Sequence, residues 1–308
     1  MTEARPILAV AALVFAGFAE GVPAQLAAAV HVTTHTSQSC SPLGACTYIA
    51  GTSWWFNHPE SLHLVTSNLN PGGGLAGVYF AASIGSAPHP DFPLERVLMA
   101  SPHSLVPEGA AFNLLTVREA QTCFYAHTAT AGNIVSNVTF LDHPLMNGDP
   151  GAFLLVLSDG AEPPTNVGVF YDSGRSQWGI FNEDLSAMAI GRRFSAYVNG
   201  CDIGLGLRGP ITCTAPVGEI CGGTGTLIAP GDPHAKILLT QRWTGVGVYN
   251  PHPIGVFYDP FDQAWKVFNE DLADMPLNAR FNVAVIDVLL NDDFESGDTA
   301  AWSNWSAP

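Results

Sequence analysis

The sequence is poor in positive charge and in charged residues of any kind. Only two of its 308 residues are lysines, Lys236 and Lys266, and acidic residues outnumber basic ones by 27 to 11, for a formal net charge of −16. A surface of this charge repels the phosphates of nucleic acids and the headgroups of anionic lipids. We therefore expect no nucleic-acid partner.

Signatures of catalysis are lacking as well. The chain contains no G-x-S-x-G nucleophile elbow, no P-loop and no H-E-x-x-H zinc motif. No two cysteines have C-x-x-C spacing, which argues against a structural zinc site. The sequence therefore predicts a non-enzymatic protein without a cofactor and indicates no catalytic residue.

Long helical patterns are also missing beyond the N-terminus. No later stretch repeats its apolar residues with the 3.6-residue period of a helix, whereas 31 glycines and 23 prolines suit many short strands and turns. These features predict an all-β protein with little helix outside the N-terminal segment.

One long block of sequence occurs twice. Residues 167–198 align without a gap with residues 254–285, and 15 of the 32 aligned positions are identical. In each copy, two runs rich in β-branched and aromatic residues flank turn residues, and a third alternating run follows. A later turn holds Gly191 in one copy and Asn278 in the other, the two residue types that best tolerate a left-handed backbone. Each copy therefore predicts a hairpin and a return strand.

The repeat extends upstream and, more weakly, into the N-terminal part. Gly-Asp-Pro precedes a strand-like run at 148–150 and again at 231–233, and Phe112 matches Phe194 and Phe281. In the first copy the aromatic hairpin is missing, and the Pro- and His-rich segment Ser86–Ser104 stands in its place. We divide the chain into a signal segment (1–24), a degenerate first repeat (25–120), two further repeats (121–200 and 201–288) and an acidic tail (289–308).

These divisions predict three tandem antiparallel β repeats. β-sandwich-like units are the first expectation, and a closed pseudo-threefold arrangement is the second.

The N-terminal segment and the cysteines indicate export. Residues 1–24 combine a basic residue, a short apolar run and a small-residue site, as a secretory signal does. The apolar run is too short for a typical membrane span, so we expect no span in the mature chain and an extracellular or cell-surface location. Six cysteines then favour disulfides. Cys40–Cys46 and Cys213–Cys221 could close small loops and Cys123–Cys201 could bridge the middle repeat, although other pairings remain open.

Two adjacent pairs of carboxylates recur in the duplicated block, Glu183-Asp184 and Glu270-Asp271. Paired carboxylates can hydrolyse glycosides when they face each other across the bond. Neighbours on a turn diverge more often than they converge, and both pairs follow Asn in a turn-forming context. We interpret all four as structural turn residues.

The aromatic residues supply the ligand candidates. Trp178 and Trp265 occupy equivalent places within the predicted hairpins, which favours core packing. Trp54 and Trp55 are adjacent on a strand and face opposite sides, so one is exposed or at an interface. Trp243 lies on a loop, with Tyr249 close behind it. We take Trp54, Trp55, Trp243 and Tyr249 as candidates for a ligand or interface contact.

Several motifs resemble a known repeat. HTATAGNI from His127, DHPL from Asp142, NGDP from Asn147, NPHPIGVFY from Asn250 and WKVFN from Trp265 are similar to a repeat of secreted bacterial proteins of unknown function. The resemblance covers the second and third repeats and implies export and tandem use alongside other extracellular modules. It implies no activity, so no catalytic residue is carried over.

The acidic C-terminal stretch resembles a tail of the form FESGDT-x-AWS that recurs at the ends of exported bacterial proteins. It is interpreted either as a sorting or attachment signal or as a frayed terminus. Its carboxylates offer oxygens to calcium, although the EF-hand spacing is absent. These weak calcium candidates are Asp292, Asp293, Glu295 and Asp298.

Together these features predict an exported structural or adhesive subunit that self-associates through strand edges and exposed aromatics, as a filament or surface layer. A carbohydrate-binding module that uses Trp243 or Trp55 is the alternative, with a glycan or cell surface as partner. A secreted hydrolase is the third hypothesis.

Overall fold

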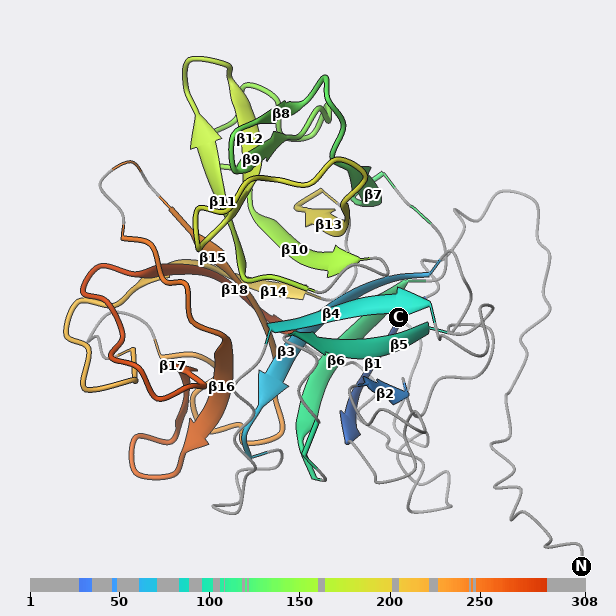
Figure 1. Cartoon of the computed structure of the whole chain (residues 1–308). Helices are drawn as coiled ribbons and strands as arrows, with labels where there is room; N and C mark the ends of the chain where they lie inside the picture. The colour runs from blue at the N-terminus through green and yellow to red at the C-terminus, as the bar shows by residue number, and fades with distance from the viewer. Residues whose placement is uncertain are drawn as a thin grey trace, which may run out of the picture.

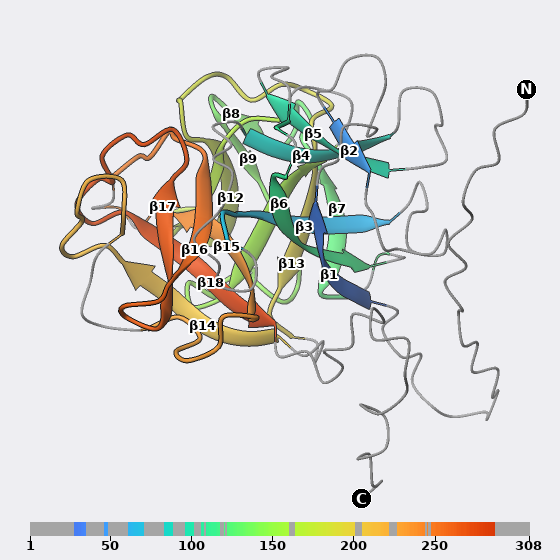
Figure 2. The ribbon, with the colours of Figure 1, turned by 90° about the horizontal axis from the view of Figure 1, so that it is seen from below.

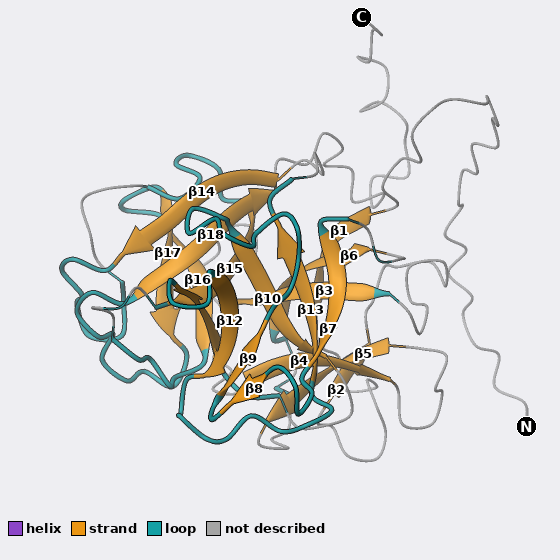
Figure 3. Ribbon diagram, turned by 90° about the horizontal axis from the view of Figure 1, so that it is seen from above, coloured by secondary structure: helices purple, strands orange, loops and turns teal. Residues whose placement is uncertain are grey.

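The computed structural model describes residues 28–34, 46–48, 61–70, 83–88, 96–101, 106–107, 109–117, 120, 122–159, 164–200, 205–221, 227–243, 245 and 248–286. Every helix or strand in these ranges is a β-strand, so the all-β prediction is confirmed (Figure 3). Across the same ranges, no helix has the length and apolar character needed to cross a membrane. The predicted signal segment and acidic tail lie outside the described residues.

The strands form three sheets. The first has the order β1 (Ala28–Thr34), β6 (Ala111–Val117), β3 (Leu62–Asn68), β16 (Ile254–Asp259) and β17 (Ala264–Asn269). The second has the order β2 (Cys46–Tyr48), β5 (Arg96–Ser101), β4 (Ser83–Pro88), β10 (Leu154–Asp159), β13 (Arg193–Val198) and β7 (Phe124–Thr128). The third has the order β14 (Leu205–Thr212), β18 (Arg280–Ile286), β15 (Lys236–Arg242), β11 (Val167–Asp172), β12 (Gln177–Asn182), β9 (Val138–Phe140) and β8 (Ile134–Val135).

Each sheet combines strands from two of the predicted repeats. Three antiparallel strands from one repeat (β1-β6-β3, β7-β13-β10 or β14-β18-β15) are joined by the hairpin of another (β16-β17, β4-β5 or β11-β12). The joins are the parallel pairs of β3 with β16, β10 with β4 and β15 with β11. The last hairpin pairs with the first repeat, so the exchange closes on itself, and the hairpins point outward in three directions (Figure 1). Seen from below, β1, β6 and β3 run together beside the β16–β17 hairpin (Figure 2). The three sheets are compatible with the predicted tandem repeats.

The duplicated block folds into equivalent strands in both copies. Residues 167–198 form β11, β12 and β13, and residues 254–285 lie in β16, β17 and β18. Trp178 and Trp265 are buried, as predicted, and each indole N–H donates to a backbone carbonyl of the Gly-Asp-Pro turn at 2.8 Å. Gly191 and Asn278 have φ values of 89° and 69°, which confirms the left-handed turn.

The first repeat contains a hairpin where none was expected. The Pro- and His-rich segment forms β4 and β5, which pair from Ser83 with Ser101 to Pro88 with Arg96. A Cβ on Gly85 would lie 2.9 Å from the carbonyl oxygen of Ser158. This hairpin therefore closely approaches β10, and its backbone pairing rather than aromatic content defines it.

Buried polar side chains connect the three sheets at the centre. Asn113, Ser195 and Asn282 occupy the same place on β6, β13 and β18, and all three are fully buried. The contacts are Asn113 Nδ2 to the Ile237 carbonyl (3.0 Å), Asn282 Nδ2 to the Leu154 carbonyl (2.8 Å) and the His63 N–H to Ser195 Oγ (3.3 Å). Burial of a polar group is costly unless it is hydrogen-bonded, so these contacts favour one relative placement of the sheets.

Candidate functional site

An aromatic surface covers the outer face of the β11–β12 hairpin. We call Phe170, Phe181, Trp243 and Tyr249 the aromatic platform. The Trp243 and Tyr249 rings stack with centroids 6.3 Å apart and an interplanar angle of 22°. Trp243 meets Phe170 edge-to-face at 6.0 Å, and Tyr249 meets Phe181 in the same way at 5.7 Å. The structure therefore brings together two of the four predicted ligand candidates.

Two glycines make room for the base of the aromatic platform. Phe170 and Gly179 are directly opposite on the hairpin, as are Gly168 and Phe181. A Cβ on Gly179 would lie 2.9 Å from the Phe170 ring, and one on Gly168 would lie 2.5 Å from the Phe181 ring. Real Cβ atoms almost never come so close. Each phenylalanine therefore lies over the backbone of the neighbouring strand, and the two rings form an apolar base.

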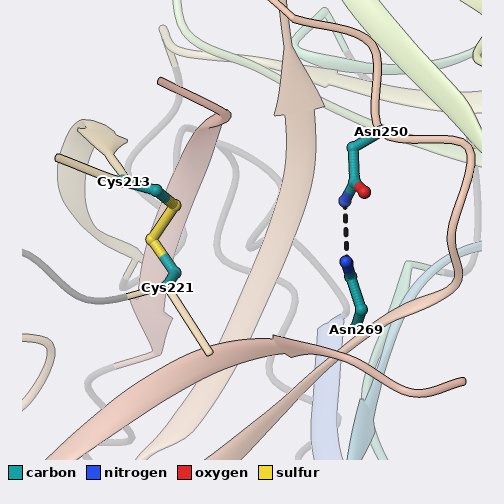
Figure 4. Close-up of a disulfide and its surroundings, with 4 residues drawn as sticks. All are labelled: Cys213, Cys221, Asn250 and Asn269. Carbon is teal, nitrogen blue, oxygen red and sulfur yellow. Dashed lines mark hydrogen bonds between the residues drawn. A yellow bond between two sulfur atoms is a disulfide. The ribbon is translucent and has the colours of Figure 1, made fainter. Parts of the chain in front are cut away.

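Buried hydrogen bonds hold both ends of the loop that supplies the two upper rings. At its start, the Trp243 N–H donates to the Val169 carbonyl at 2.9 Å, which continues the pairing of β15 with β11. At its end, Asn250 is buried and donates through Nδ2 to Asn269 Oδ1 at 2.9 Å (Figure 4). Gln241 Nε2 donates to the Asn250 carbonyl at 2.9 Å. Hydrogen bonds to the sheets therefore hold Trp243 itself and Asn250, the residue next to Tyr249.

A charged pair borders the aromatic platform. Phe140 on β9 packs edge-to-face on Phe170 at 6.2 Å, and the Arg175 guanidinium lies 4.5 Å from the Phe140 ring centroid. Arg175 also contacts the Asp172 carboxylate at 3.7 Å, and both side chains are partly exposed. Hydrogen-bonding groups are therefore available beside the apolar rings.

The corresponding face of the β16–β17 hairpin has a similar pair of phenylalanines. Phe257 and Phe268 meet edge-to-face at 5.6 Å, as Phe170 and Phe181 do at 5.8 Å. Lys266 takes the place of Gly179 opposite Phe257. Sequence reasoning found Trp243 and Tyr249 from their loop position but missed the phenylalanines beneath them. The signal was the pairing of Phe with Gly across the hairpin.

Of the four turn carboxylates, the two glutamates are buried. Glu183 Oε2 accepts from the Asn250 N–H at 3.0 Å, and burial raises the Glu183 pKa to about 8. Burial also raises the pKa of Glu270 to about 8, while the Ser67 hydroxyl bonds to its carboxyl group and opposes the shift. Gly168 and Gly255 leave space for these groups, because a Cβ on either would lie within 2.5 Å of a glutamate Oε1.

The two aspartates lie at the surface and cap their turns. Asp184 Oδ1 accepts from the Ser186 N–H at 2.9 Å, and Asp271 Oδ1 accepts from the Ala273 N–H at 3.1 Å. Asp271 also contacts His252 Nδ1 at 2.7 Å. Within each pair the glutamate is buried and the aspartate is exposed. In the described part of the chain, no group of three or more His, Cys, Asp or Glu could hold a metal ion.

The disulfide prediction is confirmed for one pair. Cys213 and Cys221 are bonded and lie beside the β17 strand (Figure 4). Cys123 is also disulfide-bonded. Cys40, Cys201, Trp54 and Trp55 lie outside the described residues, as do the side chain of Cys46 and the calcium candidates of the tail.

A family model matches a large part of the chain. The model described as a domain of unknown function (DUF7452) matches residues 96–200 and 223–285, which together are more than half of the sequence. The matched spans contain all four residues of the aromatic platform and both buried glutamates. Neither the curated proteins nor the solved structures gave a significant match.

Proposed function

The chain belongs to the family described as a domain of unknown function (DUF7452), and from its geometry we propose that it is a non-enzymatic module that binds carbohydrate. The stacked pair of Trp243 and Tyr249 carries this proposal. A pyranose ring has an apolar C–H face and a polar rim of hydroxyls. Burying the C–H face on a flat aromatic surface removes apolar area from water, which is the dominant favourable term in association.

The form of the aromatic platform supports this function. Tyr249 is 41% exposed and Trp243 is half-buried, so both rings combine solvent access with a packed base. The loop is held at both ends, and a pre-ordered surface loses little conformational entropy on binding. Arg175 and Asp172 provide a donor and an acceptor for sugar hydroxyls at the border.

Charge narrows the class of glycan. A net charge of −16 disfavours sulfated and uronic-acid polymers through long-range repulsion. We therefore propose neutral or amino-containing glycans as ligands, met outside the cell. The Cys213–Cys221 disulfide supports an extracellular location because disulfides persist in oxidising compartments.

A glycan array with the labelled protein tests the proposal. We expect signal on neutral or amino-containing glycans and its loss in Trp243→Ala. Phe261→Ala is the matched control, since Phe261 is 94% exposed on the turn of the other aromatic hairpin, away from the aromatic platform. Binding confined to sulfated glycans, or equal signals from wild type and Trp243→Ala, would contradict the proposal.

A structural or adhesive role through self-association is the second candidate. Leu185 and Leu272 occupy equivalent turns, both are 53% exposed, and both have left-handed φ values near 60°. A left-handed backbone at leucine costs conformational free energy. The presence of an exposed leucine in this conformation at both turns therefore supports a role in contact with other molecules. Sedimentation velocity over a hundredfold range of concentration tests it, and a monomer at every concentration would contradict it.

Two of the sheet edges favour such side-chain contacts over pairing of strand edges. β17 is the edge strand of the first sheet, but its outer side already makes backbone hydrogen bonds. The Cys221 N–H donates to the Val267 carbonyl, and the Asn269 N–H donates to the Glu219 carbonyl. On the third sheet, Pro210 interrupts the β14 ladder at an irregularity in its register, which is a common protection of an edge strand.

A further inference from the structure

The sequence contains three Asp–Pro peptide bonds, and two of them occupy equivalent places in successive repeats. Asp149–Pro150 precedes β10 and Asp232–Pro233 precedes β15, each within a Gly-Asp-Pro turn. The third bond, Asp259–Pro260, lies in the turn between β16 and β17. Both aspartates of the Gly-Asp-Pro turns are exposed. Water therefore reaches the two equivalent bonds.

The aspartate carbonyl oxygen of each equivalent bond accepts two hydrogen bonds. The Asp232 carbonyl accepts from the Trp265 indole N–H at 2.8 Å and from the Ala235 backbone N–H at 3.4 Å. Around the Asp149 carbonyl, the corresponding donors are Trp178 at 2.8 Å and Ala152 at 3.3 Å. Both tryptophans are buried in the core, so the indole donors have a fixed position. Two N–H donors on one carbonyl oxygen stabilise the negative charge that forms when a nucleophile attacks the carbonyl carbon.

The aspartate side chain supplies a nucleophile beside the same carbonyl group. Asp232 Oδ1 accepts from the His234 N–H at 2.9 Å, and Asp149 Oδ1 accepts from the Gly151 N–H at 2.8 Å. A carboxyl group bonded to the N–H two residues later lies along the intervening Asp–Pro peptide. Attack on the carbonyl carbon of its own residue closes a five-membered ring. Because proline nitrogen carries no hydrogen, it cannot attack the side chain instead, and the carboxylate is the available nucleophile.

We propose that the chain cleaves itself at Asp149–Pro150 and Asp232–Pro233. A carboxylate oxygen of the aspartate forms a bond to the carbonyl carbon of the same residue. The bond from that carbon to the proline nitrogen then breaks, and the nitrogen takes a proton from the solvent. The product is a cyclic anhydride, which one water molecule hydrolyses to a C-terminal aspartate with two carboxyl groups. The net change is the hydrolysis of one peptide bond.

The indole donor distinguishes these two bonds from the third. Asp259 Oδ1 also accepts from the N–H two residues later, that of Phe261, at 2.9 Å. Trp265 lies on the strand paired with this one, but it donates its indole N–H to the Asp232 carbonyl. The Asp259–Pro260 bond is therefore an internal control that has the carboxyl contact without this donor.

Cleavage at Asp232 would cut the chain without separating its parts. The last fragment, residues 233–308, contains β15 to β18. Its strands pair with β14, β11 and β3 of the preceding part. All six cysteines precede residue 233, so pairing between strands rather than a disulfide holds this fragment. The product is a nicked protein whose last fragment is released on unfolding.

Incubation of the purified full-length chain at pH 5 and 37 °C tests the proposal. Samples are denatured without a reducing agent, and their fragments are identified by mass spectrometry. We expect fragments that begin at Pro233 and at Pro150. Asp232→Asn removes the nucleophile and abolishes the cut before Pro233, whereas the cut before Pro150 continues. An intact wild type, or an unchanged cut in Asp232→Asn, would overturn the proposal.

Trp265→Phe tests the indole donor, because it removes the N–H and keeps an aromatic ring in the core. The loss of one such donor slows acyl transfer by about 10²–10³, so we expect the cut before Pro233 to be at least about tenfold slower. The cut before Pro150 serves as the control within the same molecule and should keep its rate. Equal rates before Pro233 in this variant and in wild type would contradict the role of Trp265.

A second measurement needs no variant and covers the case in which Trp265→Phe does not fold. Wild type is incubated at the same pH with and without 8 M urea, and the cuts at all three Asp–Pro bonds are quantified. In urea no bond has an indole donor, so we expect similar rates at the three bonds. In the folded protein, the cuts after Asp149 and Asp232 should be at least about tenfold faster than the cut after Asp259. Equal rates at the three bonds of the folded protein, or the same preference in urea, would overturn the proposal.

Discussion

The buried carboxyl group of Glu183 accepts a hydrogen bond from the backbone N–H of Asn250, 67 residues later in the chain, at 3.0 Å. Glu183 directly follows the hairpin that forms the base of the aromatic platform, and Asn250 ends the loop that carries its upper rings. This single contact therefore connects the two parts of the proposed carbohydrate site. It also makes the placement of Tyr249 depend on a titratable group.

The first prediction concerns the pH dependence of stability. The Glu183 pKa is about 8 in the folded protein, against 4.5 for the unperturbed group. Between these values the folded state keeps a proton that the unfolded state has lost, so the free energy of unfolding decreases as the pH rises. The slope is about 1.4 kcal/mol per pH unit for this group.

Urea unfolding of wild type and Glu183→Gln between pH 5 and 8 measures this contribution. The difference in unfolding free energy between the two proteins should change with that slope across the range. Parallel pH profiles for the two proteins would show that Glu183 is not buried as a neutral acid.

The second prediction concerns Gly168. A methyl group there would lie 2.4 Å from Glu183 Oε1 and 2.5 Å from the Phe181 ring. Gly168→Ala should therefore destabilise the fold by about 1–3 kcal/mol, the usual cost of overpacking. Gly132→Ala is the matched control, since its nearest neighbour would be at 3.8 Å. Equal unfolding midpoints for the two variants would refute the close approach.

The third prediction concerns the polar contacts at the centre. Asn282→Ala leaves the buried Leu154 carbonyl without its donor, which should cost about 1–3 kcal/mol. Asn147→Ala removes an exposed amide that bonds only to Asp142 and His143 at the surface, and it should cost less than about 0.5 kcal/mol. Denaturant unfolding of both variants measures the two effects. A small cost for Asn282→Ala would show that the sheets are not joined there.

The fourth prediction concerns the disulfide. Replacing Cys213 and Cys221 with serine opens a loop with a sequence separation of 8. Loop-closure entropy then predicts a loss of about 2–3 kcal/mol in unfolding free energy. Calorimetry of the double variant, with the reduced wild type for comparison, measures this loss. A double variant as stable as the oxidised protein would contradict the prediction.

Much of the local structure could be predicted from the sequence, because it depends on local signals. The alternation around Tyr171 and Trp178 indicated a hairpin with a buried tryptophan, and Asn278 indicated a left-handed turn. The short spacing of Cys213 and Cys221 indicated their disulfide. Each of these features is decided within about ten residues of the chain.

The joins between repeats could not be predicted, because they leave no local pattern. Gly255 pairs with Ser67, 188 residues earlier in the chain, and the sequence around either residue does not indicate its partner. The Pro-rich first hairpin was missed for a similar reason, since its neighbours rather than its composition hold it in place. The burial of Glu183 and Glu270 did leave a signal, because both copies also keep the glycine that makes room for the carboxyl group.

The most direct test of the carbohydrate-binding account is titration calorimetry with the glycan that binds best on the array. Wild type, Trp243→Ala, Tyr249→Ala and Phe261→Ala are compared at the same pH and salt. Removing one ring of the stacked pair deletes about 1.5–3 kcal/mol of apolar contact, so we predict affinities at least about tenfold weaker for Trp243→Ala and Tyr249→Ala. Phe261→Ala should bind like wild type. Unchanged affinity after the loss of either platform ring would contradict the account.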